Sequence, residues 1–182
     1  MSLISTNDSV LLVIDIQTKL VQAVFNPSQL LRKATVMAKA ASILNIPAIV
    51  TEQYPVGLGS TVNELIQVLP NDTRYFEKNT FSALDNLEIA ELLRVARKKQ
   101  VILFGIETHI CVSQTAIALT ELGYDVYVVS DACSSRQEVE YIAGLERMKE
   151  HGVHILTAEI ALFEWLRGSK HPNFKEIQNL IK

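Results

Sequence analysis

The chain has 182 residues, 48% of them hydrophobic, and a formal net charge of −3. A chain of this size can bury roughly 70% of its unfolded surface in one core, so we expect a single domain over residues 1–182. The charge gives no basic face for nucleic acid, and neither a signal-peptide pattern nor an apolar run of about 18 residues occurs, so we expect a cytoplasmic protein without membrane contact.

Short apolar runs alternate along the chain with longer segments of helical periodicity. We expect strands at residues 10–14, 48–51, 74–77, 101–104, 126–130 and 154–156, and helices at residues 28–44, 62–68, 87–96, 111–122, 137–151 and 158–165. Asp85 is a candidate N-cap for the third of these helices. This alternation is typical of an α/β fold with a doubly wound, mostly parallel six-stranded sheet in the order 3-2-1-4-5-6, a Rossmann-like three-layer sandwich with helices on both faces.

The closing segment "HPNFKEIQNLIK" has the pattern of a short amphipathic helix. Its apolar positions are Phe174, Ile177, Leu180 and Ile181. They need a surface to lie on, and a neighbouring subunit would supply one. On this ground we expect a homo-oligomer.

Three polar side chains follow expected strands at the points where those strands end. Asp15 follows the first strand, Lys78 the third, and Cys111 the fourth. In an open parallel sheet, ligands bind outside the carboxyl ends of the strands, where the strand order reverses. With the order 3-2-1-4-5-6 the first and fourth strands flank that reversal, so we expect the three side chains to meet there.

A cation is needed to make the sulfur of Cys111 a nucleophile at neutral pH. A free cysteine has a pKa of about 8.5, and a helix N-terminus supplies only about 0.3–1 kcal/mol of anion stabilisation. An ammonium within about 4–6 Å lowers the pKa by about 1–3 units, so we expect Lys78 to leave Cys111 substantially ionised and Asp15 free to move protons. Backbone N–H groups of the turn "IETHIC" are candidate donors to an oxyanion. Cys133 has no comparable partner and is interpreted as structural.

Taken singly, each of these residues also has an inert interpretation. Cys111 could be a small buried side chain, Asp15 could accept hydrogen bonds from loop amides, and Lys78 could be a solvated charge. No GxGxxG follows the first strand, so a dinucleotide site is not expected. His151 and His154 lie on either side of the junction between an expected helix and an expected strand, and His109 and His171 lack acidic or histidine neighbours at ligand spacing. We therefore expect no metal and no cofactor.

Three separated segments resemble a known family in their order and spacing. They are "LLVIDIQ", "EKNTFSA" and "GIETHICV", and the chain resembles the isochorismatase-like cysteine hydrolases over nearly its whole length. Within that family, "GIETHIC", "VVSDACSSR" and the closing segment are most similar to the isochorismatase domain-containing subgroup.

The resemblance implies an Asp-Lys-Cys catalytic triad on Asp15, Lys78 and Cys111. It also implies a cis peptide bond between Ile106 and Glu107, with the backbone N–H groups of Glu107 and Cys111 as the oxyanion hole, and it is a second ground for expecting a homo-oligomer. Two features depart from other branches of the family. Nicotinamidases carry an Asp-x-His metal motif where this chain reads "TEQYPVG", and isochorismatases proper cleave a vinyl ether without this cysteine.

Together these observations favour a metal-independent cysteine hydrolase that cleaves a C–N bond of a small amide or carbamoyl compound through a thioester. Gln17, Tyr54 and Phe81 are candidates for the wall of the substrate pocket. Two alternatives stay open. The first is a catalytically idle scaffold that binds a metabolite or a protein partner, and the second is vinyl ether hydrolysis of the isochorismatase type.

Overall fold

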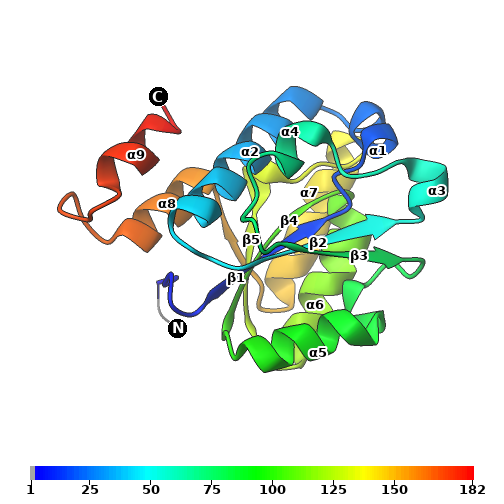
Figure 1. Cartoon of the computed structure of the whole chain (residues 1–182). Coiled ribbons are helices and arrows are strands. Elements are labelled where there is room, and N and C mark those ends of the chain that lie inside the picture. The colour runs from blue at the N-terminus through cyan, green and yellow to red at the C-terminus, as the bar shows by residue number, and fades with distance from the viewer. Residues whose placement is uncertain (1–2) are drawn as a thin grey trace.

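The computed structural model describes residues 3–182 and contains the expected six-stranded sheet (Figure 1). The strand order is β3-β2-β1-β4-β5-β6, and every neighbouring pair is parallel. The strands are β1 (Ser9–Ile14), β2 (Ala48–Gln53), β3 (Arg74–Lys78), β4 (Gln100–Gly105), β5 (Asp125–Val129) and β6 (His154–Leu156). The order reverses between β1 and β4, which are direct neighbours, so the predicted α/β class and topology are confirmed.

Helices cover both faces of the sheet, with α2 and α8 on one side and α5 and α6 on the other (Figure 1). The α-helices are α1 (Thr18–Ala23), α2 (Pro27–Ile43), α3 (Pro55–Leu58), α4 (Asn63–Ile66), α5 (Leu87–Ala96), α6 (Ser113–Glu121), α7 (Glu138–Glu150), α8 (Ala158–Leu166) and α9 (Phe174–Asn179). Three short turns complete the set: 3-10 turns η1 (Ala83–Asp85) and η3 (Ser130–Ala132), and a π turn η2 (Thr108–Val112). The helix expected at residues 62–68 is one turn long, and α1 and α3 were not predicted.

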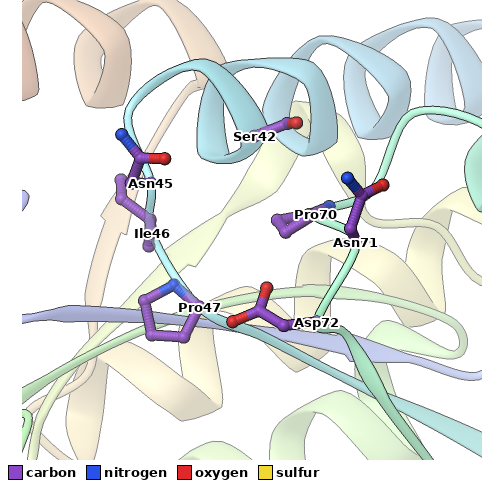
Figure 2. A pocket seen from close by; sticks show the side chains of 7 residues that line it. All are labelled: Ser42, Asn45, Ile46, Pro47, Pro70, Asn71 and Asp72. Atoms are coloured by element: carbon purple, nitrogen blue, oxygen red, sulfur yellow. The ribbon is translucent and has the colours of Figure 1, made fainter.

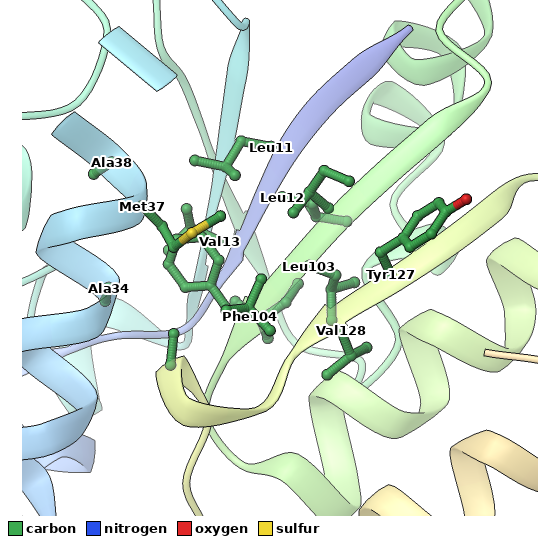
Figure 3. Close-up of a cluster of buried hydrophobic side chains, with 14 of the residues drawn as sticks. Leu11, Leu12, Val13, Ala34, Met37, Ala38, Leu103, Phe104, Tyr127 and Val128 are labelled. Atoms are coloured by element: carbon green, nitrogen blue, oxygen red, sulfur yellow. The ribbon is translucent and has the colours of Figure 1, made fainter. Parts of the chain in front are cut away.

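The core is a continuous apolar layer between the central strands and α2. Every residue of β1 and of β4 is buried, as continuous apolar runs in a doubly covered parallel sheet should be. Figure 3 shows Met37 of α2 facing Val13 and Phe104, with Ala34 and Ala38 on the same helix. Each large apolar side chain buried in this way contributes about 1.5–3 kcal/mol. Strands β1 and β4, which flank the reversal of strand order, are therefore held within the core.

Helix α5 spans Leu87–Ala96, as expected, but its cap differs from the prediction. The side chain of Asn86, rather than Asp85, caps it, because Asn86 Oδ1 accepts a hydrogen bond of 2.9 Å from the backbone N–H of Glu88. Asp85 lies in the preceding 3-10 turn. Both residue types favour the N-cap position, so the sequence pattern does not distinguish them.

The apolar face of the closing segment packs on the chain itself. Ile177 is buried in the core, and Phe174, Leu180 and Ile181 pack against that core. The ring of Phe174 meets that of Phe163 edge-on, with centroids 6.4 Å apart. This segment therefore gives no reason to require a neighbouring subunit, which corrects the argument made from its sequence.

Candidate active site

Asp15 lies at the point where the chain leaves β1. Its φ of 51° turns the chain out of the sheet directly after Ile14. The side chain is fully buried, and its Oδ1 accepts a hydrogen bond of 2.6 Å from the hydroxyl of Thr51 in β2. The backbone N–H of Asp15 donates to the carbonyl of Thr51 at 3.1 Å. Two bonds to one residue of the adjacent strand thus fix the carboxylate at the carboxyl end of the sheet.

Lys78 closes β3 and directs its ammonium to that carboxylate. Lys78 Nζ lies 2.7 Å from Asp15 Oδ2, and the side chains of both residues are fully buried. Nζ also donates to Gln53 Oε1 at 2.6 Å and to the backbone carbonyls of Thr80 at 3.2 Å and Phe81 at 3.3 Å. Buried charges are tolerated when they are paired and hydrogen-bonded, and this pair meets both conditions.

Cys111 lies in η2, the π turn that precedes α6, and it is 7% exposed. Both Asp15 and Lys78 lie close enough to the thiol to shift its pKa. The structure therefore brings a carboxylate, an ammonium and a sulfur together from the ends of three different strands.

The charge on the sulfur differs from the sequence-based expectation. The pKa of the Cys111 thiol is raised to about 12, first by burial and then by the negative charge of Asp15, while Lys78 lowers it. The prediction that Lys78 leaves Cys111 substantially ionised is therefore wrong for the unliganded protein. Burial of the thiol is the first reason, and the second is that the ammonium is already paired with a carboxylate at 2.7 Å.

Gly105 lets β4 turn directly into the segment that carries the sulfur. Its φ is 141°, and a Cβ atom at this position would lie 2.0 Å from the carbonyl oxygen of Ile14. The backbone N–H of Ile106 donates to that same carbonyl at 2.9 Å. The next peptide bond, between Ile106 and Glu107, is cis. A residue without a side chain is thus required where β4 passes the end of β1.

The loop after β5 fastens this turn. The backbone N–H of Ser134 donates to the carbonyl of Gly105 at 3.3 Å, and the N–H of Thr108 donates to the carbonyl of Ser134 at 2.9 Å. Arg136 donates from its backbone N–H and from Nε to Glu107 Oε2, at 3.1 and 3.0 Å. These bonds hold the Glu107 backbone from two sides, so the turn presents its N–H groups in a fixed geometry.

Cys133, the second cysteine, lies in the same region without a comparable set of partners. Burial raises the pKa of its thiol to about 12, and its favourable contact is a hydrogen bond with the backbone of Gly105. It lacks the ion pair that lies beside Cys111, which agrees with its interpretation as a structural side chain.

The three residues expected to line the pocket have different positions. Gln17 is fully buried beneath residues 53–59, where its Nε2 donates to the carbonyls of Gln53 at 3.0 Å and Gly59 at 2.6 Å, and its Oε1 accepts from the N–H of Gln53 at 2.8 Å. The Gln17 amide donates both of its protons to backbone carbonyls. Gln17 therefore holds the loop of residues 53–59 and is not part of a pocket wall. Tyr54 and Phe81 are each about half exposed, 55% and 53%, and both are hydrogen-bonded to Lys78 through their backbones.

Sequence reasoning missed two residues of the site, Thr51 and Gln53. Both lie on β2, two positions apart, so their side chains point to the same face of the sheet. Thr51 bonds Asp15, and Gln53 bonds Lys78. The sequence did carry a signal, because the apolar run of β2 ends in three consecutive polar residues at positions 51–53, of which the first and third share a face.

A hollow of about 340 Å³ occupies the opposite edge of the sheet (Figure 2). It lies between the end of α2 and the segment before β3, and it is lined by Ser42, Asn45, Ile46, Pro47, Pro70, Asn71 and Asp72. Pro47 immediately precedes β2, so the hollow is at the amino ends of the strands.

Among the described residues, His, Cys, Asp and Glu form no group of three or more that could hold a metal ion. Within residues 3–182, no helix has the length and apolar character that crossing a membrane requires.

A comparison with protein families gives one match that spans most of the chain. The model of the isochorismatase domain matches residues 9–160. The chain belongs to the isochorismatase family. That match includes β1, β3, η2 and the loop that fastens the turn, so the whole of the site described above lies inside the isochorismatase domain.

Individual members of the isochorismatase family resemble the chain along most of its length. Isochorismatase domain-containing protein 2 of Danio rerio is 41% identical over 179 residues, which cover 98% of this chain and 89% of that protein. The structure of MAR1 ribonuclease from Caenorhabditis elegans is 38% identical, with a TM-score of 0.93 and coverage of 99% and 92% of the two chains. The YcaC gene product of Escherichia coli, described as an octameric hydrolase of unknown specificity, is 26% identical, with a TM-score of 0.88 and coverage of 98% and 94%.

Proposed function

We propose that this isochorismatase-family protein is a metal-independent cysteine hydrolase that cleaves a C–N bond of a small amide or carbamoyl compound through a thioester. The contact of Asp15, Lys78 and Cys111 in one buried cluster carries the proposal. A nucleophile in hydrogen-bond contact with a base, and a base oriented by a third group, is the general arrangement for covalent catalysis.

The raised pKa of the thiol decides how the first step proceeds. Because Cys111 is protonated at rest, its proton passes to Asp15 as the sulfur attacks the substrate carbonyl carbon. The C–S bond forms, and the electron pair of the carbonyl moves to its oxygen. The backbone N–H groups of Glu107 and Cys111 then bind that oxyanion. Lys78 stabilises the negative charge as it develops on the sulfur.

The second half of the reaction returns the enzyme to its starting state. Asp15 donates its proton to the departing nitrogen, the C–N bond breaks, and an acyl thioester with Cys111 remains. A water molecule gives a proton to Asp15 and attacks the thioester carbon. The C–S bond breaks, the acid leaves, and the proton returns from Asp15 to the sulfur.

The test is ammonia release from a panel of small amides and carbamoyl compounds. We expect turnover in the wild-type protein and in Cys133→Ala, and no turnover in Cys111→Ala. Mass spectrometry of the wild-type protein quenched in acid should show an acyl adduct on Cys111. Ammonia release that survives Cys111→Ala would contradict the assignment of Cys111 as the nucleophile. Hydrolysis of a vinyl ether substrate that tolerates Cys111→Ala would support the isochorismatase-type alternative, and the absence of both turnover and adduct across the panel would favour the idle scaffold.

We do not extend the ribonuclease name of the Caenorhabditis elegans structure to this chain. A net charge of −3 gives no general attraction to a phosphate backbone, which supplies most of non-specific nucleic-acid affinity.

We also propose that the protein forms a homo-oligomer. The octameric state of the Escherichia coli neighbour supports this, together with strongly exposed apolar side chains such as Val56 at 89% and Leu87 at 81%. Light scattering should give a mass that is a multiple of 20.3 kDa. A monomeric mass at micromolar concentration would contradict it.

A further inference from the structure

The mechanism above assigns no role to Gln53, although its side chain contacts Lys78. Gln53 Oε1 lies 2.6 Å from Lys78 Nζ, closer than the carbonyl oxygens of Thr80 at 3.2 Å and Phe81 at 3.3 Å. An ammonium has three protons and no acceptor, so the amide must present its oxygen to it. Gln53 is thus the nearest uncharged partner of the cation.

The sheet register explains why these two side chains meet. Gln53 of β2 and Lys78 of β3 are paired positions of parallel strands, and paired side chains lie on the same face. Thr51, two residues earlier on β2, lies on that face as well and bonds Asp15. Strand β2 therefore supplies one acceptor for the ammonium and one donor for the carboxylate of the same ion pair.

The side chain of Gln53 is itself fixed from two directions. Its Nε2 donates to the carbonyl of Asn79 at 3.0 Å, which orients the amide. Its backbone N–H and carbonyl are both bonded by the side chain of Gln17, at 2.8 and 3.0 Å. Strand β1 ends at Ile14, so its backbone does not pair with β2 at Gln53. The side chain of Gln17 supplies the hydrogen bonds at this position instead.

We propose that Gln53 is a positioning residue that acts through Lys78. It holds the ammonium between Asp15 and Cys111 and so sets the reactivity of the sulfur; this inference rests on the proposed hydrolase site. Without the side chain of Gln53, the ammonium loses its acceptor on β2, and the segment after β3 loses the bond that Gln53 donates to the carbonyl of Asn79. The ammonium then turns to the carbonyls of Thr80 and Phe81. The stabilisation of a thiolate by a cation falls as the two charges separate, so the sulfur becomes less reactive.

The experiment measures the rate of alkylation of Cys111 by iodoacetamide at pH 8, with peptide mass spectrometry and Cys133 as the internal reference. Gln53→Met, which is close in size and lacks the acceptor, should slow the alkylation of Cys111 by about fivefold or more. The same substitution is then made in a background with both charges removed, Asp15→Asn with Lys78→Met. There its effect should fall within about twofold, because a residue that acts through Lys78 has nothing left to act on.

An equal loss in both backgrounds would overturn the inference, because a structural or substrate-contacting role does not need Lys78. An unchanged rate for Gln53→Met in the wild-type background would overturn it as well. If Gln53→Met does not fold, as judged by circular dichroism, Gln53→Asn replaces it, since its amide is one methylene too short to reach. Failure of the proposed function is a separate result: wild-type Cys111 would then be alkylated no faster than Cys133, and the inference would fail with it.

Discussion

The carboxylate of Asp15 and the ammonium of Lys78 form an ion pair of 2.7 Å in which neither side chain is exposed to solvent. A buried charge that loses its partner bears an uncompensated desolvation penalty. Asp15 and Lys78 are therefore coupled in stability as well as in chemistry.

Lys78→Met should lower the free energy of unfolding by about 3–5 kcal/mol, because it leaves Asp15 as an unpaired buried acid. The double variant with Asp15→Asn should recover most of that loss. Urea denaturation at pH 7 measures both. The control is Lys33→Met, which breaks a partly exposed pair of 3.3 Å with Asp131 and should cost no more than about 1 kcal/mol. Equal losses in Lys78→Met and the double variant would show that Asp15 does not depend on this cation.

The raised pKa of Cys111 predicts a steep pH dependence of its alkylation. A group with a pKa of about 12 is almost wholly protonated at neutral pH, so its thiolate fraction rises about tenfold for each pH unit between about 6 and 9. The rate of iodoacetamide labelling should rise in the same proportion. A rate that is flat between pH 6 and 7 would instead reveal a thiolate at rest. Free cysteine, whose rate begins to level off near pH 8.5, is the reference compound.

Gly105→Ala should destabilise the protein by at least about 3 kcal/mol, because its Cβ would overlap the carbonyl oxygen of Ile14. Gly123→Ala is the matched control. Gly123 also has a positive φ, of 84°, but a Cβ there meets nothing within 4 Å, so only the backbone penalty of about 1 kcal/mol remains. Thermal unfolding of both variants gives the comparison. Similar losses in the two would show that the close approach of β4 to β1 is unimportant.

Gln17→Met should loosen the segment that follows β2 without disturbing the sheet. It removes three hydrogen bonds to the backbone of Gln53 and Gly59. Amide hydrogen exchange of residues 53–60 should accelerate by about tenfold or more, while β4 is unaffected. Lys19→Met is the control, because Lys19 makes one exposed contact with this segment, to the carbonyl of Gly57. If residues 53–60 exchange at the same rate in both variants, the hydrogen bonds of Gln17 do not hold this segment in place.

Patterns of periodicity were sufficient to predict the sheet. Strands β1 and β4 are continuous buried runs that stand out in the sequence, whereas the edge strand β3 is mostly polar and gives a weaker signal. The positions of the strands relative to one another follow from general rules of α/β topology. The same rules placed Asp15, Lys78 and Cys111 at one edge, where they lie in contact.

The charge state and the surroundings of the site could not be predicted in this way. Whether Lys78 ionises Cys111 or neutralises Asp15 depends on distances of a few ångströms, and these favour the carboxylate. Gln17 was expected in the pocket wall because it is polar and close to Asp15. Strand β1 ends before Gln17, so the backbone N–H and carbonyl of Gln53 in β2 have no strand to pair with on that side. The side chain of Gln17 forms hydrogen bonds with both of them.

Residues 134–136 hold the turn that carries Cys111, but they are synthesised after it. The strand ends that carry the carboxylate, the cation and the nucleophile all leave the ribosome before the loop that braces the peptide between Gly105 and Thr108. A nascent chain that has been made only as far as Cys111 therefore lacks the hydrogen bonds that hold this turn. The geometry of the site is complete only when β5 and the loop after it have formed beside β4.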